Sequence, residues 1–231
     1  MIFSGGNMRR TKNVRDEKSA KRKKSVGVAK NTTGNKSIED KKAFGAKKSV
    51  RDAMRELLPE CEEIFDAKLR AATLKAWIVG LERGGWKPAD IDFLPFTLLI
   101  PECDVSLLAH TRAVTKAATR LGDVVAEFFS ESLSINRDVL ISGALVHDVG
   151  KLLEFEKKQG FFVKSPTGAL LRHPFSGVFL AERAGLPPEV IHIVAVHAHE
   201  GDAGYRSAEA IIVNHCDFAI FESLRAKGKA K

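Results

Sequence analysis

From Arg51 onward, the apolar residues recur at the spacing of an α-helix, and this pattern limits the fold more than any other feature of the chain. One helix is indicated by Ile64, Leu74, Trp77, Ile78 and Leu81, and another by Leu107, His110, Val114, Ala117 and Leu121. The Gly84–Gly85 pair is expected to end the first of these helices. The sequence shows no internal repeat and no convincing alternation of apolar and polar residues. We therefore predict an all-α fold, a helical bundle.

Short polar side chains mark where further helices begin, because they accept hydrogen bonds from the free N–H groups of a first turn. The candidate caps are Asp104 or Ser106, Asn136 and Ser207, while Pro174 and the Pro187–Pro188 pair suit first-turn positions. The helix that follows Asn136, "RDVLISGALVHDV", is expected to end near Gly150. Residues 161–174, "FFVKSPTGALLRHP", are expected to form a loop, and residues 86–104 a connector.

The first fifty residues differ in composition from the rest of the chain. They hold 15 Lys and Arg against 4 Asp and Glu, whereas residues 51–231 hold 22 basic and 25 acidic residues. Large apolar residues are too few in the first segment to bury a core, so we expect a disordered basic tail over 1–50 and a helical domain over 51–231. The cluster "KSAKRKKSVG" suits weak contact with nucleic acid or an anionic surface, or a nuclear address. Met8 is an alternative start.

Composition also limits where such a chain works. No apolar run approaches the roughly 18 residues of a transmembrane helix, so we expect no membrane association. The first residues, "MIFSGGNMRR", lack the apolar core of a secretory signal. The three cysteines, Cys61, Cys103 and Cys216, are far apart, and we interpret them as reduced thiols. These features favour a cytoplasmic protein.

Several histidines and aspartates fall on the apolar faces of the predicted helices or at their ends, where a bare polar group costs a few kcal/mol. They are His110, His147, Asp148, His173, His197 and Asp217. A single histidine in such a place is more often a hydrogen-bonded core residue, and a single aspartate often caps a helix or pairs with arginine. The number and order of these residues favour a shared site instead. A divalent cation in the core of the bundle would satisfy all six.

The order of these residues resembles a known family. The chain resembles the HD-superfamily metal-dependent phosphohydrolases in the series of His110, the pair His147–Asp148 and Asp217. It also resembles them in four segments, which are "LLAHTRAV", "ALVHDVGKL", "RHPFSGVFLAERAGLPPEVIHIVAVHAHEGD" and "AIIVNHCDFA". The resemblance covers about residues 95–225 and leaves the basic tail out. It implies an HD-domain helical bundle and hydrolysis of a phosphoester or phosphoanhydride by a metal-activated water.

The resemblance also assigns roles to individual positions. His110, His147, Asp148 and Asp217 match the core metal ligands, and His173 and His197 match two further histidines that hold a second ion in some members. We choose His197 over His199 because the helical phase turns His197 inward. Lys151 matches a lysine placed near the substrate phosphate, and Glu200 is expected near the mouth of the site. Arg172 either contacts the phosphate or is a surface residue.

The residue types suit this chemistry. Mixed imidazole and carboxylate ligands favour one or two ions of Mn, Fe, Co, Ni or Zn, with Mg less suited. Such ions polarise a phosphoryl oxygen and activate a water, so Asp148 and Lys151 are the expected catalytic residues. Lys151 and Arg172 would balance negative charge on the phosphate.

Several substrates and rival functions stay open. A small phosphorylated substrate, most simply a nucleotide, is the expected partner. Residues 197–207, "HAHEGDAGYRS", partly match the "HHExxDGxGYP" motif of cyclic-dinucleotide phosphodiesterases, but the histidines are not adjacent and the proline is missing. A regulatory HD module without catalysis is a second alternative, and an enzyme that is anchored to nucleic acid by the basic tail is a third.

Overall fold

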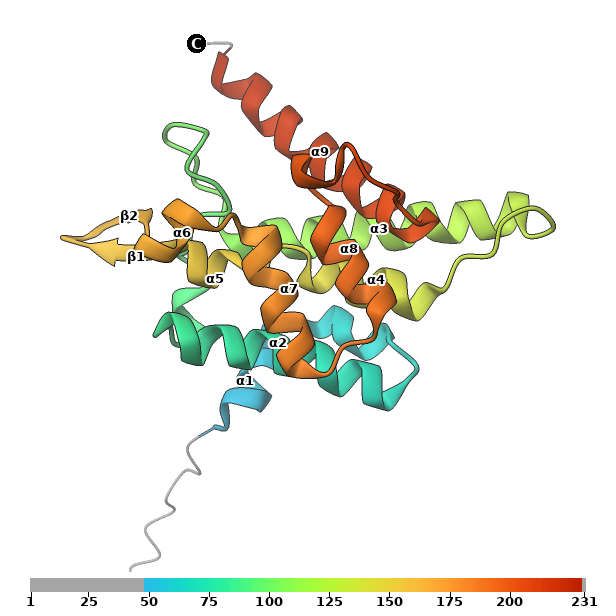
Figure 1. The fold of residues 1–231 in the computed structure, drawn as a ribbon, viewed down its shortest axis with the longest axis horizontal. Coiled ribbons are helices and arrows are strands. Elements are labelled where there is room, and N and C mark those ends of the chain that lie inside the picture. Colours follow the sequence, from blue (N-terminus) through green and yellow to red (C-terminus); the bar gives the residue numbers. More distant parts are fainter. Residues whose placement is uncertain (1–47, 230–231) are drawn as a thin grey trace, which may run out of the picture. The chain divides into compact units, whose positions relative to one another are not determined.

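The computed structural model describes residues 48–229, and α-helices make up most of this part of the chain (Figure 1). The helices are α1 (Val50–Leu57), α2 (Ala67–Gly84), α3 (Leu107–Phe129), α4 (Arg137–Val146), α5 (Lys151–Glu154), α6 (Pro166–Leu170), α7 (His173–Ala184), α8 (Pro188–Val196) and α9 (Ala208–Lys229). Short 3₁₀ turns cover Pro59–Glu63, Pro88–Asp90 and His199–Gly201. The predicted all-α class is confirmed, whereas nearly all of the predicted tail lies outside the described residues. None of the described helices is both long and apolar enough to cross a membrane.

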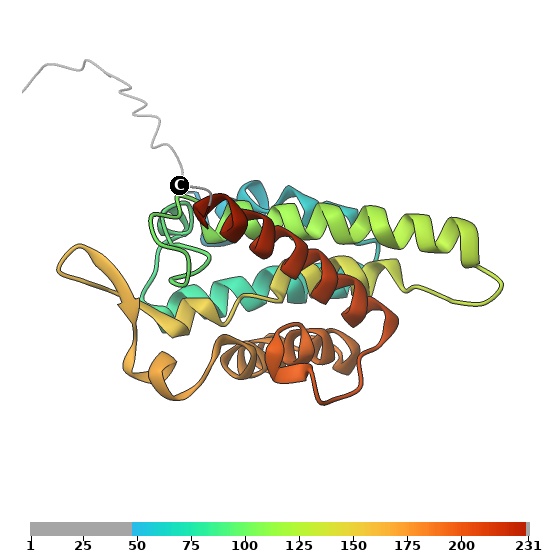
Figure 2. The same ribbon diagram turned by 90° about the horizontal axis from the view of Figure 1, so that it is seen from above.

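Helix α4 lies at the centre of the core. Every residue from Val139 to Val146 is buried, as expected from the apolar run "VLISGALV". Helices α2, α3, α8 and α9 all pack against α4, and Figure 2 shows it between α3 on one side and α7 and α8 on the other. The indole Nε1 of Trp77 in α2 donates a hydrogen bond to the carbonyl oxygen of Leu145 over 2.9 Å. The apolar helix that carries the His147–Asp148 pair is therefore held from several sides.

The predicted helix boundaries are largely confirmed by their caps. Ser106, and not Asp104, caps α3, because its Oγ accepts a hydrogen bond from the Ala109 N–H. Asn136 caps α4 and Ser207 caps α9 in the same way. Gly85 ends α2 with a φ of 72°, a left-handed conformation that glycine adopts without strain. Helix α4 itself ends at Val146, so His147 and Asp148 stand in the turn that follows it and not within the helix.

The loop predicted over 161–174 is wrong in part. Phe155–Lys158 (β1) and Phe161–Lys164 (β2) form an antiparallel hairpin, and Pro166–Leu170 forms α6. The hairpin turns at Gln159 and Gly160, both of which have positive φ. Four-residue strands are too short for a clear alternating pattern, and Gln in place of Asn or Asp weakens the usual signal of such a turn. Figure 1 shows the hairpin projecting beyond α5 and α6.

Candidate metal centre

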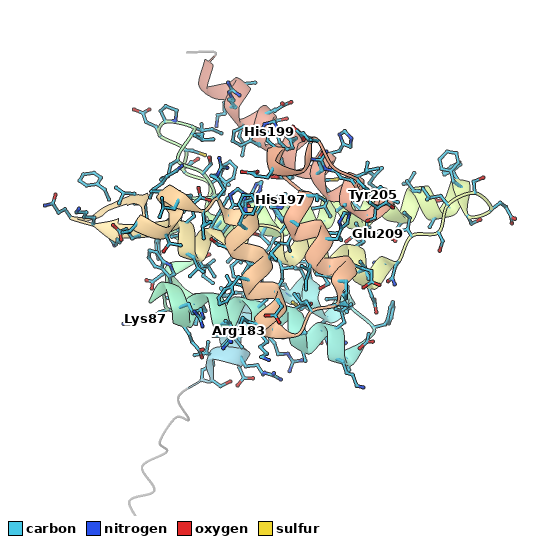
Figure 3. All side chains as sticks on the ribbon, in the orientation of Figure 1. Lys87, Arg183, His197, His199, Tyr205 and Glu209 are labelled. Atoms are coloured by element: carbon cyan, nitrogen blue, oxygen red, sulfur yellow. The ribbon has the colours of Figure 1, made fainter. Side chains whose placement is uncertain are left out.

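The six predicted ligands lie within five helices or directly after them, and they meet in one place. His110 lies in the first turn of α3, and Asp217 lies in α9. His147 and Asp148 follow α4 directly, His173 is the first residue of α7, and His197 directly follows α8. His197 stands where α7, α8 and α9 come together in Figure 3. Five of the six are buried, and the side chain of Asp217 is 16% exposed.

A glycine brings two of these segments into contact. Gly150 follows the His147–Asp148 turn, and a Cβ atom built on it would lie 2.0 Å from the carbonyl oxygen of His173. A side chain at this position would therefore push α7 away from the end of α4. The glycine in "HDVGK" thus holds His173 close to Asp148, with 3.3 Å between Nε2 of the histidine and Oδ1 of the aspartate.

The six side chains form two groups that share one carboxylate. The ligand atoms of His110, His147 and Asp217 lie within 4.8 Å of one another, as do those of Asp148, His173 and His197. Oδ1 of Asp148 faces the second group and lies 3.6 Å from Nε2 of His197. Its Oδ2 faces the first group, at 3.5 Å from Nε2 of His110 and 3.4 Å from Nε2 of His147. If both groups held a cation, Asp148 would contribute one carboxylate oxygen to each group.

The hydrogen bonds of three histidines fix which ring nitrogen points inward. Nδ1 of His147 lies 2.7 Å from the carbonyl oxygen of Ala144, and Nδ1 of His197 lies 2.8 Å from that of Val194. A carbonyl oxygen only accepts, so each Nδ1 carries the proton and each Nε2 keeps a lone pair. Nδ1 of His173 contacts a carboxylate in the same manner. Outward N–H groups and inward lone pairs are the usual arrangement of metal-binding histidines.

Several inward atoms have no hydrogen-bond partner within the described part of the chain. They are Nδ1 and Nε2 of His110, Nε2 of His147 and Oδ1 of Asp148. Nε2 of His110 approaches Oδ1 of Asp217 to 2.9 Å, but the contact lacks hydrogen-bond geometry. Leaving a buried polar atom unpaired costs about 1 to 3 kcal/mol. Divalent cations between the two groups would satisfy one ring nitrogen of His110, Nε2 of His147 and Oδ1 of Asp148, so the residues present fit a metal centre.

Burial and neighbouring charges hold most of these ligands in the protonation states that bind cations. Burial lowers the pKa of His110 and lowers that of His173 to about 4, so both imidazoles are neutral at pH 7. Burial opposes ionisation of Asp217, but the contact with His110 outweighs it and the pKa falls to about 2. Burial likewise opposes ionisation of Asp148, and nearby Lys151 outweighs it and lowers its pKa. Neutral imidazoles and ionised carboxylates are the forms that bind cations.

His147 differs from the other histidines in this respect. Its burial lowers the pKa, but the charge of adjacent Asp148 outweighs the burial and the pKa is raised. A proton therefore competes with a cation for Nε2 of His147.

Comparison with known proteins agrees with the geometry. The family model of the HD domain matches residues 107–218, a segment that contains all six predicted ligands. The chain is also similar to the dihydroneopterin 2',3'-cyclic phosphate phosphodiesterase of Methanocaldococcus jannaschii, with 35% identity over 116 residues. The match covers 49% of this chain and 45% of that relative, so the chain spans less than half of the relative's length. No solved structure matches the chain.

Glu154 was not predicted from the sequence as a residue of the site. It is 3% exposed, and its Oε2 lies 2.8 Å from both the backbone N and Nδ1 of His173. Gly168 packs on its backbone, since a Cβ at Gly168 would lie 2.1 Å from the Glu154 carbonyl oxygen. The available signal was one acidic residue between Leu153 and Phe155, a setting in which a carboxylate needs a partner.

The residues predicted to contact substrate lie beside the metal centre. Nζ of Lys151 is 2.5 Å from Oδ2 of Asp148. Arg172 is half-exposed, and its Nε lies 3.5 Å from Oε1 of Glu154 and 3.7 Å from Oε1 of Glu200. Lys151 and Arg172 line a cavity of about 200 Å³ that also reaches His173 and Asp217, whereas Glu200 does not line it. The cavity therefore connects the metal centre to cationic side chains that include Lys151 and Arg172.

His199 lines the cavity but is turned away from the ligand groups. Its side chain is 78% exposed, and its Nδ1 lies 2.8 Å from Oδ2 of Asp202. The helical phase predicts an inward His197 and an outward His199, and their side chains lie on these two sides (Figure 3). The ring of His199 packs edge-on against Phe218, with 4.7 Å between the ring centroids.

Proposed function

We propose that this protein is a metal-dependent phosphohydrolase of the phosphodiesterase class that acts on a small, nucleotide-like phosphoester. The observation that carries the proposal is the convergence of six histidine and aspartate side chains, five of them buried, in which atoms of His110, His147 and Asp148 lack hydrogen-bond partners within the described residues. The proposed ligands are His110, His147, Asp148, His173, His197 and Asp217. The match to the HD-domain family model and the activity for which the relative is named support the same class of reaction.

The chain's own residues would bind and orient the phosphate. Two bound cations would polarise a phosphoryl oxygen and lower the pKa of a water. The Lys151 ammonium, which is buried beside Asp148, supplies a positive charge at the edge of the centre. The Arg172 guanidinium, which also lines the cavity, presents donors in a planar fork that suits phosphate oxygens. Hydrolysis adds one water across one P–O bond and leaves a phosphomonoester and a hydroxyl.

Nucleoside or pterin 2',3'-cyclic phosphates are the substrates that we propose to test first. The relative from Methanocaldococcus jannaschii is named for hydrolysis of dihydroneopterin 2',3'-cyclic phosphate. A cavity of about 200 Å³ with cations beside the centre suits a phosphate on a small heterocyclic molecule.

We further propose Mn²⁺, Fe²⁺, Co²⁺, Ni²⁺ or Zn²⁺ as the bound ion, because imidazole suits these metals better than it suits Mg²⁺. A cytoplasmic location is part of the same proposal.

The test combines metal analysis with a substrate panel. Wild-type protein and the Asp148→Ala variant are each stripped with chelator, reloaded with Mn²⁺, Fe²⁺, Co²⁺, Ni²⁺ or Zn²⁺, and assayed. The panel holds nucleoside 2',3'-cyclic phosphates, dihydroneopterin 2',3'-cyclic phosphate, nucleoside monophosphates and bis(p-nitrophenyl) phosphate. We expect one or two ions per chain in the wild type, and a fall in turnover of about 10²- to 10³-fold in the variant.

Two outcomes would overturn the proposal. One is a wild-type chain that retains none of these metals after desalting. The other is a metal-loaded chain that hydrolyses no member of the panel. An Asp123→Ala variant is the matched control, because Asp123 is an exposed carboxylate of α3 paired with Arg137 on the surface. Its metal content and turnover should equal those of the wild type.

A further inference from the structure

The cavity at the metal centre continues along α9, past the residues that would hold metal and phosphate. Its lining there includes Phe218, Phe221 and Arg225 of α9. At about 100° per residue, Asp217, Phe218, Phe221 and Arg225 all fall within an arc of about 100° on one face of the helix. The same face of α9 therefore carries a metal-centre residue, two aromatic rings and a guanidinium in sequence.

A second segment faces this part of α9. The chain between α2 and α3 lies beside the C-terminal half of α9 in both views (Figures 1 and 2). It contributes Phe96, Leu98 and Leu99 to the cavity, and the rings of Phe96 and Phe221 meet edge-on with 6.2 Å between centroids. Leu98 and Leu99 are 40% and 70% exposed, although they flank a concave site. This slot, between residues 96–99 and the Phe218–Arg225 face of α9, has apolar walls suited to a flat ring.

The slot also has a marked bias in hydrogen bonding. Of the described residues that line the cavity, the only acids are Glu154 and Asp217, and both are engaged at the metal centre, with His173 and His110 respectively. At the far end, Arg225 offers N–H donors in a fixed fork and no acceptor. A ring with two neighbouring acceptors matches this fork, whereas a ring that presents an amino group there does not.

We propose that this slot binds a 6-oxopurine, that is, a guanine-type base, whose O6 and N7 accept the two hydrogen bonds of Arg225. The base lies against Phe218 and Phe221 while its phosphate reaches the metal centre, so the inference rests on the proposed function and names its substrate class. About 12 Å separates the Cα atoms of Asp217 and Arg225 along α9, at the rise of an α-helix, which is the scale of a ribose with a bicyclic base. Adenine carries an amino group at position 6 and loses one of the two hydrogen bonds.

Binding by metal-free protein tests the slot without relying on catalysis. Chelator-treated protein is titrated calorimetrically with guanosine 3'-monophosphate and adenosine 3'-monophosphate. We expect the guanine nucleotide to bind about 10- to 100-fold more tightly, the discrimination typical of a bidentate arginine contact. Arg225→Ala should remove this preference. Phe221→Ala should lower the affinity for both nucleotides by a similar factor, because stacking does not distinguish the bases.

Lys227→Ala is the matched control, because Lys227 is an exposed cation of α9 that does not line the cavity. It should bind both nucleotides as the wild type does. Equal affinities for the two nucleotides in the wild type would overturn the inference, and so would a guanine preference that persists in Arg225→Ala. Hydrolysis is scored separately with guanosine 2',3'-cyclic phosphate and bis(p-nitrophenyl) phosphate on metal-loaded protein. A guanine preference without any hydrolysis would refute the proposed function alone, whereas hydrolysis of both esters without a preference would refute the slot alone.

Discussion

Two sets of histidines lie on opposite sides of the segment around α8, and they differ in the partners of their ring nitrogens. His192 and His199 have ordinary protein partners, since Nε2 of His192 accepts from the Ser207 N–H and Nδ1 of His199 contacts Asp202. His197, from the same stretch, is fully buried and faces Nε2 of His173 at 3.2 Å. Two imidazole nitrogens with inward lone pairs have no reason to meet unless something lies between or beside them. The contrast separates structural histidines from candidate ligands better than burial alone does.

Replacing one histidine from each set by alanine should give the largest difference in metal content and turnover between two variants. In His197→Ala we expect loss of metal from the group formed by Asp148, His173 and His197, and a fall in turnover of at least about 100-fold, more than an outer-shell change produces. His192→Ala should keep metal and turnover and lose about 1 kcal/mol of stability, because it removes the hydrogen bond to Ser207 and the ring stacking on Tyr205 and no ligand of the metal centre. Metal content per chain, turnover and chemical denaturation measure the three effects. Equal metal content in both variants would contradict the assignment.

Glu154 tests the comparison at a residue that contacts the proposed ligand His173 but is not itself a ligand. In Glu154→Gln, the amide keeps the size of the side chain but loses the charge that faces Nδ1 of His173. We expect metal affinity to fall by about 10- to 100-fold, the usual effect of an outer-shell partner. Glu156→Gln in β1 is the control, because Glu156 lies outside the cavity lining. If competition with a chelator gives the same metal affinity for Glu154→Gln and the wild type, Glu154 only packs against α7.

These residues also show which features of the fold and the site can be predicted from the sequence. The all-α class, the caps and the inward faces of His110 and Asp217 followed from periodicity, because helical phase is a local property of the chain. Glu154 and the Phe218–Arg225 face depend on which segments meet in space, and no local pattern encodes that. The hairpin was missed because its strands are short. The domain division at residue 50 and the role of the basic tail stay predictions, because residues 1–47 lie outside the described part of the chain.

Two glycines test whether close backbone contact positions the site. Gly150→Ala places a methyl group 2.0 Å from the carbonyl oxygen of His173, so α7 must shift. We expect a loss of about 1 to 3 kcal/mol in the free energy of unfolding, together with weaker metal binding. Gly204→Ala should change stability by less than about 0.5 kcal/mol, because the nearest atom to its added Cβ is 3.6 Å away. Similar unfolding midpoints for the two variants would show that the approach of α7 to the end of α4 tolerates a side chain.

The thiols extend the comparison to residues whose burial serves packing alone, and here we expect the smallest effect. Cys61 is fully buried, and this burial raises its pKa to about 12, while burial also raises the pKa of Cys216. The thiolate is the reactive form, so both should resist modification in the folded protein. Cys103 is only partly buried and lies outside the core. A thiol reagent at pH 8 should therefore modify one cysteine per folded chain quickly, and Cys103→Ser should abolish that fast phase. Two or more fast equivalents in the wild type would mean that the region around α1 or α9 opens more readily than its packing indicates.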